Sequence, residues 1–149
     1  MRKIILIFLP IILLSFLVAA QERRNAVQWE ALKGWNHPTV KAYIDTKSVR
    51  YNSEVRQGFG IILFVSFARR EIDNGKGGKV MSNTIARYLI ADCKSALVAP
   101  ISEFYFDLNH LPDLTDKPVG GLNYSADELD AKSISKSSPI YQALCPIQL

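Results

Sequence analysis

Residues 88–93 read Tyr-Leu-Ile-Ala-Asp-Cys, and the cysteine that ends this stretch, Cys93, has one candidate partner in the chain, Cys145. In an oxidising compartment, two cysteines are expected to form a disulfide. The bond would close a loop of about 52 residues, for which loop-closure entropy gives roughly 4 kcal/mol of stabilisation. The alternative is a catalytic or metal-binding thiolate, although there is no Cys-x-x-Cys motif and neither His37 nor His110 is near enough in sequence to form a pair of zinc ligands.

The N-terminal residues have the pattern of a secretory signal peptide. Arg2 and Lys3 precede an apolar run from Ile4 to Ala20, which ends in Val-Ala-Ala before the polar cluster at 21–24. This pattern predicts a signal peptide over residues 1–20, cleaved after Ala20. An uncleaved membrane anchor is the alternative, because the apolar run is near the minimum length that spans a bilayer. No cysteine lies near the junction to carry a lipid anchor. We therefore expect an exported protein that is periplasmic, secreted or on the cell surface, with no membrane span after cleavage.

The exported chain, residues 21–149, has the length of a single domain. Removal of Arg2 and Lys3 lowers the number of basic residues from 18 to 16, against 14 acidic residues, so the net charge falls from +4 to +2. No block of Lys and Arg carries the interleaved aromatic residues of a nucleic-acid surface. We therefore expect no nucleic-acid partner.

Alternating and apolar segments predict a sheet. Val27–Leu32 and Thr39–Asp45 read as strands, and Phe59–Phe67 is the most apolar and β-branched run outside the signal peptide, as expected of a central strand. Val80–Asp92 is the return strand of a long antiparallel hairpin. The glycines of Asp73–Lys79 reverse the chain between the two strands. A phosphate-binding loop is the weaker interpretation of these glycines, because the strand-to-helix context and the Lys-Ser/Thr pair are missing.

The C-terminal half adds a further strand and a helix. Lys94–Phe106 reads as a strand. Pro100 within it is tolerated only at an edge or a bulge, and we expect an edge strand. Ser138 as N-cap and Pro139 at the first helical position predict a short helix ending at Cys145. The fold class is thus α+β and mainly β: an antiparallel twisted sheet of about five to six strands, with a short C-terminal helix pinned by a Cys93–Cys145 disulfide.

Two polar or aromatic residues have predicted structural roles. Asp45 is expected to accept hydrogen bonds from backbone N–H groups in the turn that follows it. Trp35, in the turn 34–38, is expected to plug one end of the sheet, and an exposed contact residue is the alternative.

Four features in this order resemble the surface-adhesin protein E family of Gram-negative bacteria: Trp29 in the first strand, Ala42–Ser48, the hairpin end Tyr88–Cys93, and the proline-led helix that closes on Cys145. The resemblance implies a compact antiparallel sheet with a C-terminal helix. It also implies a non-enzymatic envelope protein that binds host matrix or serum proteins such as vitronectin, laminin and plasminogen, without cofactor or metal. The alternative function is a periplasmic structural or envelope-maintenance factor with no adhesive role.

A protein partner would be recognised by an exposed sheet face or edge together with the basic residues Arg69, Arg70, Lys76 and Lys79. A free sheet edge would also allow pairing with a second copy as a homodimer.

The competing enzyme hypothesis is a small periplasmic hydrolase or metal protein. It would use His110 or His37 with a nearby carboxylate such as Asp107 or Asp113. The sequence offers few of the residues such chemistry needs, because it has two histidines and no nucleophile motif. We therefore expect no catalytic residue.

Overall fold

The computed structural model describes residues 27–74, 76–113, 115–125 and 129–146. The predicted signal peptide, residues 1–20, and its cleavage site lie outside the described residues. Among the residues that are described, no helix is both long and apolar enough to cross a membrane.

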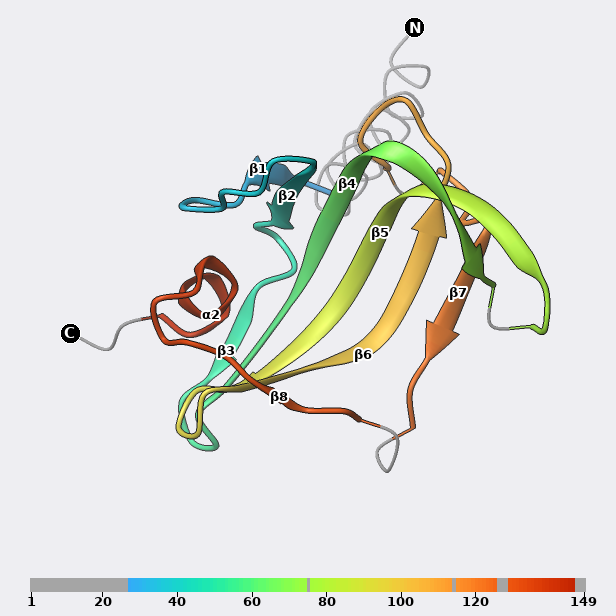
Figure 1. The fold of residues 1–149 in the computed structure, drawn as a ribbon. Helices are drawn as coiled ribbons and strands as arrows, with labels where there is room; N and C mark the ends of the chain where they lie inside the picture. The colour runs from blue at the N-terminus through green and yellow to red at the C-terminus, as the bar shows by residue number, and fades with distance from the viewer. Residues whose placement is uncertain (1–26, 75, 114, 126–128, 147–149) are drawn as a thin grey trace, which may run out of the picture.

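The described residues form one antiparallel eight-stranded sheet and one short helix (Figure 1). The strands run in the order β1-β2-β4-β5-β6-β7, while β3 pairs with β4 and β8 pairs with β6. The elements are β1 (Trp29–Ala31), β2 (Val40–Asp45), β3 (Arg50–Asn52), β4 (Gln57–Asp73), β5 (Lys79–Asp92), β6 (Leu97–Phe106), β7 (Gly120–Asn123), β8 (Lys132–Ser133) and the helix α2 (Pro139–Leu144).

The predicted fold class is confirmed, with more strands than the five to six expected. The additional strands are β3, β7 and β8, which have 3, 4 and 2 residues. They lie in polar stretches that read as turns or loops. Segments this short contain too few residues to show a period of two, so only their pairing with β4 and β6 makes them strands.

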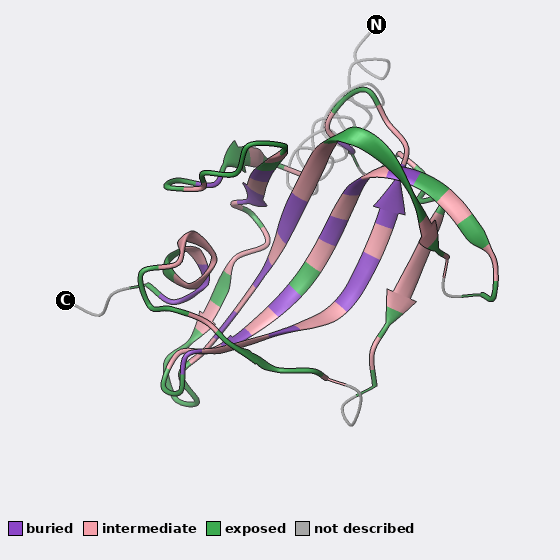
Figure 2. Ribbon diagram, in the orientation of Figure 1, coloured by how far each residue is buried: buried purple, intermediate pink, exposed green. Residues whose placement is uncertain are grey.

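The centre of the sheet is the long β4–β5 hairpin, as predicted. Ile62 and Leu63, which point to opposite faces of β4, are both 0% exposed. Both faces of the sheet are therefore covered at this point, which explains why Phe59–Phe67 is continuously apolar rather than alternating. Figure 2 shows buried residues recurring along β4, β5 and β6.

The far end of this hairpin rolls back over one face of the sheet. The register between β4 and β5 shifts between Val65 and Arg70, and the two strands bend towards β7 beyond this point (Figure 1). At the tip, Gly121 N donates to the carbonyl oxygen of Asn74 at 3.4 Å. A Cβ atom at Gly120 would lie 2.9 Å from Asn74 Cβ, so glycine is needed for this close approach. We call the face enclosed by the roll, on which Ile62 lies, the inner face.

The prediction that β6 is an edge strand is wrong. β6 pairs with β5 along one side and with both β7 and β8 along the other. Pro100 is tolerated because the register shifts beside it, where Tyr88 pairs with Ser102 but Leu89 pairs with Pro100. Ile101 is thus the extra residue of a β-bulge, and the proline also falls between the stretches that pair with β7 and β8.

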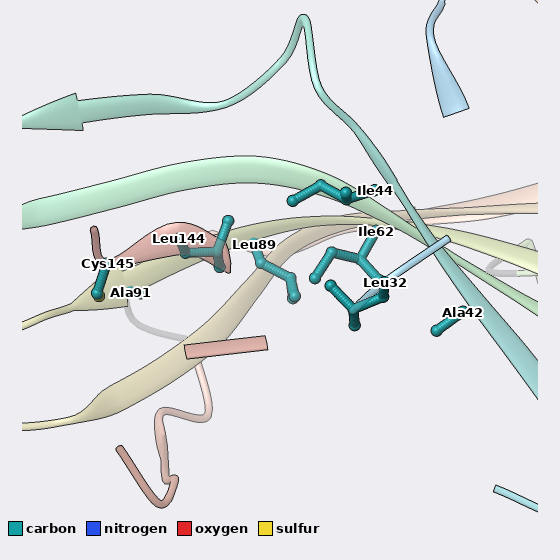
Figure 3. Packing of buried hydrophobic residues seen from close by; sticks show 8 residues of the cluster. All are labelled: Leu32, Ala42, Ile44, Ile62, Leu89, Ala91, Leu144 and Cys145. Atoms are coloured by element: carbon teal, nitrogen blue, oxygen red, sulfur yellow. The ribbon is translucent and has the colours of Figure 1, made fainter. Parts of the chain in front are cut away.

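The inner face carries the main core cluster, which α2 covers (Figure 3). Leu144 is 0% exposed and packs among side chains of β2, β4 and β5. The predicted disulfide follows directly, since the Cys93 and Cys145 sulfurs are bonded with their Cα atoms 5.6 Å apart. Tyr141 Oη also donates to the carbonyl oxygen of Cys93 at 2.8 Å, so the helix is fixed to the end of β5 by two contacts.

The start of α2 is partly as predicted. Pro139 occupies the first turn and Ser138 is at the N-cap position, but the serine side chain makes no capping hydrogen bond. The prediction that Ser138 caps the helix with its hydroxyl is therefore wrong. This six-residue helix is held instead by packing and by the disulfide.

The outer face carries a second cluster, centred on Leu63, Ala86 and Phe106. Trp29 packs against it, and its indole Nε1 donates to the carbonyl oxygen of Pro112 at 2.6 Å, which fixes residues 107–113 over this face.

Both predicted structural roles are confirmed. Asp45 Oδ1 accepts from the backbone N–H groups of Gln28 at 3.0 Å and Lys47 at 3.1 Å. Trp35 packs against the inner cluster with its ring edge on Phe64, at a centroid distance of 5.5 Å, and its indole donates to the Val40 carbonyl oxygen.

Candidate functional site: a pocket on the inner face

A pocket of about 490 Å³ lies on the inner face beside α2. Its floor is formed by β4, β5 and β6, and its sides by the segment that contains β8, by α2 and by Tyr124. The apolar side chains that line it are Phe64, Leu89, Val98, Pro100, Ile134 and Ile140. α2 covers only part of the inner face, so these side chains line a hollow instead of a filled core.

An ion pair lies at the polar side of the pocket. Arg87 and Glu103 are directly opposite each other on β5 and β6. Arg87 Nε lies 2.6 Å from Glu103 Oε1, without the alignment of a hydrogen bond. The side chain of Glu103 is 9% exposed, whereas that of Arg87 is 40% exposed. The acid is therefore buried beneath the base, and the base faces the pocket.

Two further contacts fix this pair. Tyr105 Oη donates to Glu103 Oε2 at 2.9 Å, so each carboxylate oxygen has a partner. The guanidinium carbon of Arg87 lies 5.4 Å from the centroid of the Phe64 ring, within cation–π range. The arginine is thus held between an acid and an aromatic face.

Two tyrosines at this site remain protonated over the neutral range. The pKa of Tyr105 is raised because the phenol is buried, and its hydrogen bond to the Glu103 carboxylate raises it further. The pKa of Tyr124 is also raised, mainly by burial and secondly by the charge of Glu103, while Arg87 opposes the shift. The pocket therefore presents neutral phenol rather than phenolate at pH 7.

The pocket combines an apolar surface with a few polar groups. The described residues that line the pocket include no histidine and no thiol. Glu103 is engaged by Arg87 and Tyr105 and is not placed as a free base. What remains accessible is an apolar surface with a guanidinium group and a phenol at one side.

No family model, curated protein or solved structure matches this chain. The resemblance to the surface-adhesin protein E family therefore stays a prediction that rests on the motifs of the sequence.

The four basic residues predicted to bind a partner all lie on the hairpin, away from the residues that line the pocket. Arg69 Nε pairs with Asp107 Oδ1 at 2.7 Å, and Lys79 Nζ pairs with Glu71 at 2.7 Å. Arg70 and Lys76 are exposed, and the described residues show no ion pair for either.

The carboxylates of the enzyme hypothesis have other partners. His110 Nε2 pairs with Asp116 at 3.1 Å, whereas Asp107 pairs with Arg69. Asp113 Oδ1 accepts from the hydroxyl and backbone N–H of Thr115, which lower the pKa of this carboxyl. These contacts of Asp113 are hydrogen bonds within its own loop.

The other histidine, His37, stacks on Trp35 and accepts from Thr39 N at 3.3 Å. In the described part of the chain, no group of three or more His, Cys, Asp or Glu is arranged to hold a metal ion.

No sequence motif singled out Arg87, Glu103 or Tyr124 as site residues. A signal was present, since Arg87 and Glu103 are charged residues within strands that are otherwise largely apolar. Their distance along the chain hides that they face each other. Only the pairing of β5 with β6 shows this.

Proposed function

We propose that this chain is an exported, non-enzymatic binding protein of the bacterial cell envelope. It recognises a protein partner through the curled end of the β4–β5 hairpin, residues 67–81 without the undescribed residue 75. The observation that carries the proposal is Phe67, which is 70% exposed on a strand of the hairpin, next to the exposed Arg69 and Arg70.

A large exposed aromatic residue among arginines has the composition of a protein interface. Aromatic residues and arginine are enriched at the residues that dominate binding energy. Phe67 is also close to the ammonium group of Lys41, which lies 5.6 Å from its ring centroid. Met81, on the returning strand, is 47% exposed and adds a second apolar contact. This surface suits a partner with an apolar pocket bordered by acidic groups.

The hairpin suits this role better than a sheet edge. The strands at the two ends of the order, β1 and β7, have only 3 and 4 residues. Short edge strands offer few backbone groups for pairing with another chain. A homodimer formed by edge pairing is therefore a weaker proposal than recognition by the hairpin.

Export is supported by the disulfide between Cys93 and Cys145, because such bonds persist in oxidising compartments and are rare in reducing ones. The signal-like N-terminus predicts the same destination. Fractionation with protease treatment of intact cells distinguishes a surface protein from a periplasmic structural factor, since the latter is protected until the outer membrane is opened.

The binding test uses immobilised vitronectin, laminin and plasminogen with the chain purified after export. We expect micromolar or tighter binding to at least one of them, and at least about a tenfold loss with Phe67→Ala, as for a residue that dominates an interface. Val55→Ala is the matched control, because Val55 is 56% exposed but lies in the turn before β4. The loss of binding in the double variant Arg70→Ala/Lys76→Ala is likewise compared with the loss in the control Lys33→Ala. No binding to any of the three proteins at micromolar chain, or equal losses with Phe67→Ala and Val55→Ala, would refute the proposal.

A further inference from the structure

The pocket on the inner face is separate from the hairpin surface and has the properties of a small-molecule site. Its volume of about 490 Å³ is within the range of about 300–1,000 Å³ that such sites usually have. Its apolar lining comes from β4, β5, β6, α2 and the segment after β8, so the tertiary fold and not one element creates it. A mainly apolar ligand body would bury this surface.

Arg87 and Tyr124 give the polar side of the pocket hydrogen-bond donors. Both Glu103 oxygens are already engaged, one by Arg87 and one by Tyr105. Arg87 uses the Nε edge of its guanidinium towards Glu103, and the described residues provide no hydrogen bond to its two terminal nitrogens. The guanidinium carbon also lies within cation–π range of the Phe64 ring. A planar guanidinium with free N–H groups matches a carboxylate, which can accept two parallel hydrogen bonds from it.

The charges of the lining favour a ligand with one negative charge over a ligand with two. The pocket contains two bases, Arg87 and Lys132, and two acids, Glu103 and Asp130. Lys132 Nζ lies 3.5 Å from Asp130 Oδ2, so its charge is partly compensated. A phosphate with two charges would meet two carboxylates, whereas a carboxylate needs only the free side of Arg87.

We propose that this pocket binds one small amphipathic carboxylate. Its apolar body lies against Leu89, Val98 and Ile140, and its carboxylate accepts hydrogen bonds from Arg87 and from the phenol of Tyr124. A medium-chain fatty acid has this chemistry and serves as the probe.

The first test compares decanoate with decanol by isothermal titration calorimetry, on the chain purified after export and below the micelle-forming concentration of decanoate. The two probes share the apolar chain and differ in the charged group. We expect one decanoate per chain, bound at least tenfold more tightly than decanol. Equal affinities, or no heat from decanoate at millimolar concentration, would overturn the proposal.

The second test asks whether Arg87 binds the carboxylate group of decanoate. Arg87→Lys keeps a cation beside Glu103 but removes the planar donors, so we expect at least a tenfold loss of decanoate affinity and no change for decanol. Arg50→Lys, at the exposed start of β3 and outside the pocket lining, is the matched control and keeps wild-type affinity. Tyr124→Phe should lower the decanoate affinity less, by about threefold, because it removes one neutral hydrogen-bond donor.

Unfolding of each variant is measured alongside binding. If Arg87→Lys does not fold, Val98→Trp replaces it, since a larger side chain at Val98 fills the cavity and abolishes decanoate binding. Wild-type decanoate affinity in a folded Arg87→Lys or Val98→Trp variant would show that the probe binds elsewhere and would overturn the proposal.

Discussion

Gly58 is the residue at which one added methyl group should do most damage to this fold. It lies on β4 between Tyr51 of β3 and Ala91 of β5, where the end of α2 packs on the sheet. A Cβ atom at this position would lie 2.0 Å from the carbonyl oxygen of Leu144 and 2.7 Å from its carbonyl carbon. Contacts below 3.0 Å are essentially never seen for Cβ atoms, so strand and helix must separate by about 1 Å.

The structure sets the size of the effect. Overpacking in a core usually costs about 1–3 kcal/mol, and the loss of glycine entropy from the unfolded chain returns about 0.4–1 kcal/mol. Here the clashing atoms are backbone atoms, Leu144 is fully buried, and the next residue, Cys145, is held by the disulfide. The helix end has no room to retreat, so we expect Gly58→Ala to cost about 3 kcal/mol and to lower the melting temperature by about 10 °C.

Gly60→Ala is the matched comparison. Its Cβ would lie 2.7 Å from Leu144 Cδ2, the end of a flexible side chain that can rotate away. Gly60→Ala should therefore cost less than Gly58→Ala, and combination with Leu144→Ala should cost less than the two single changes added together. Thermal and urea unfolding followed by circular dichroism measure all four variants against the wild type. A Gly58→Ala variant that melts at or above the wild-type temperature would refute this account of the helix–sheet contact.

Two further predictions concern the disulfide and a buried tyrosine. Replacement of both Cys93 and Cys145 by serine opens a loop with a sequence separation of 52 and should lower the free energy of unfolding by about 4 kcal/mol; an unchanged urea midpoint would contradict the assigned role of the bond. Burial, helped by the hydrogen bond to Glu103, raises the pKa of Tyr105 above its usual value of about 10. Above that pH the unfolded chain loses a proton that the folded chain keeps, so stability is complete below pH 10 and falls by about 1.4 kcal/mol per pH unit above it. Tyr105→Phe removes this contribution, which urea unfolding between about pH 9 and 11 measures; equal slopes for variant and wild type would contradict it.

The features that depend on short-range signals could be predicted from the sequence. The apolar run Phe59–Phe67 is the centre of the sheet, Gly77 with its positive φ lies where the chain reverses after β4, and Pro139 begins the C-terminal helix. The disulfide was predictable because only one pairing of two cysteines exists. In each case the decisive residues are neighbours in sequence or have one possible partner.

Three features could be seen only in the folded chain: the position of β6 inside the sheet, the roll of the hairpin and the pocket. Asp92 of β5 pairs with Leu97 of β6. If this register continued without a bulge, Ser102 would lie opposite Arg87. The extra residue Ile101 shifts this register by one and sets Glu103 there instead. Since a shift of one residue turns every side chain to the other face, the bulge brings Glu103 to the inner face beneath Arg87. Strand pairing and sheet curvature result from contacts between segments that are distant in sequence. These contacts place the Arg87–Glu103 ion pair and form the pocket, and no local sequence pattern predicts them.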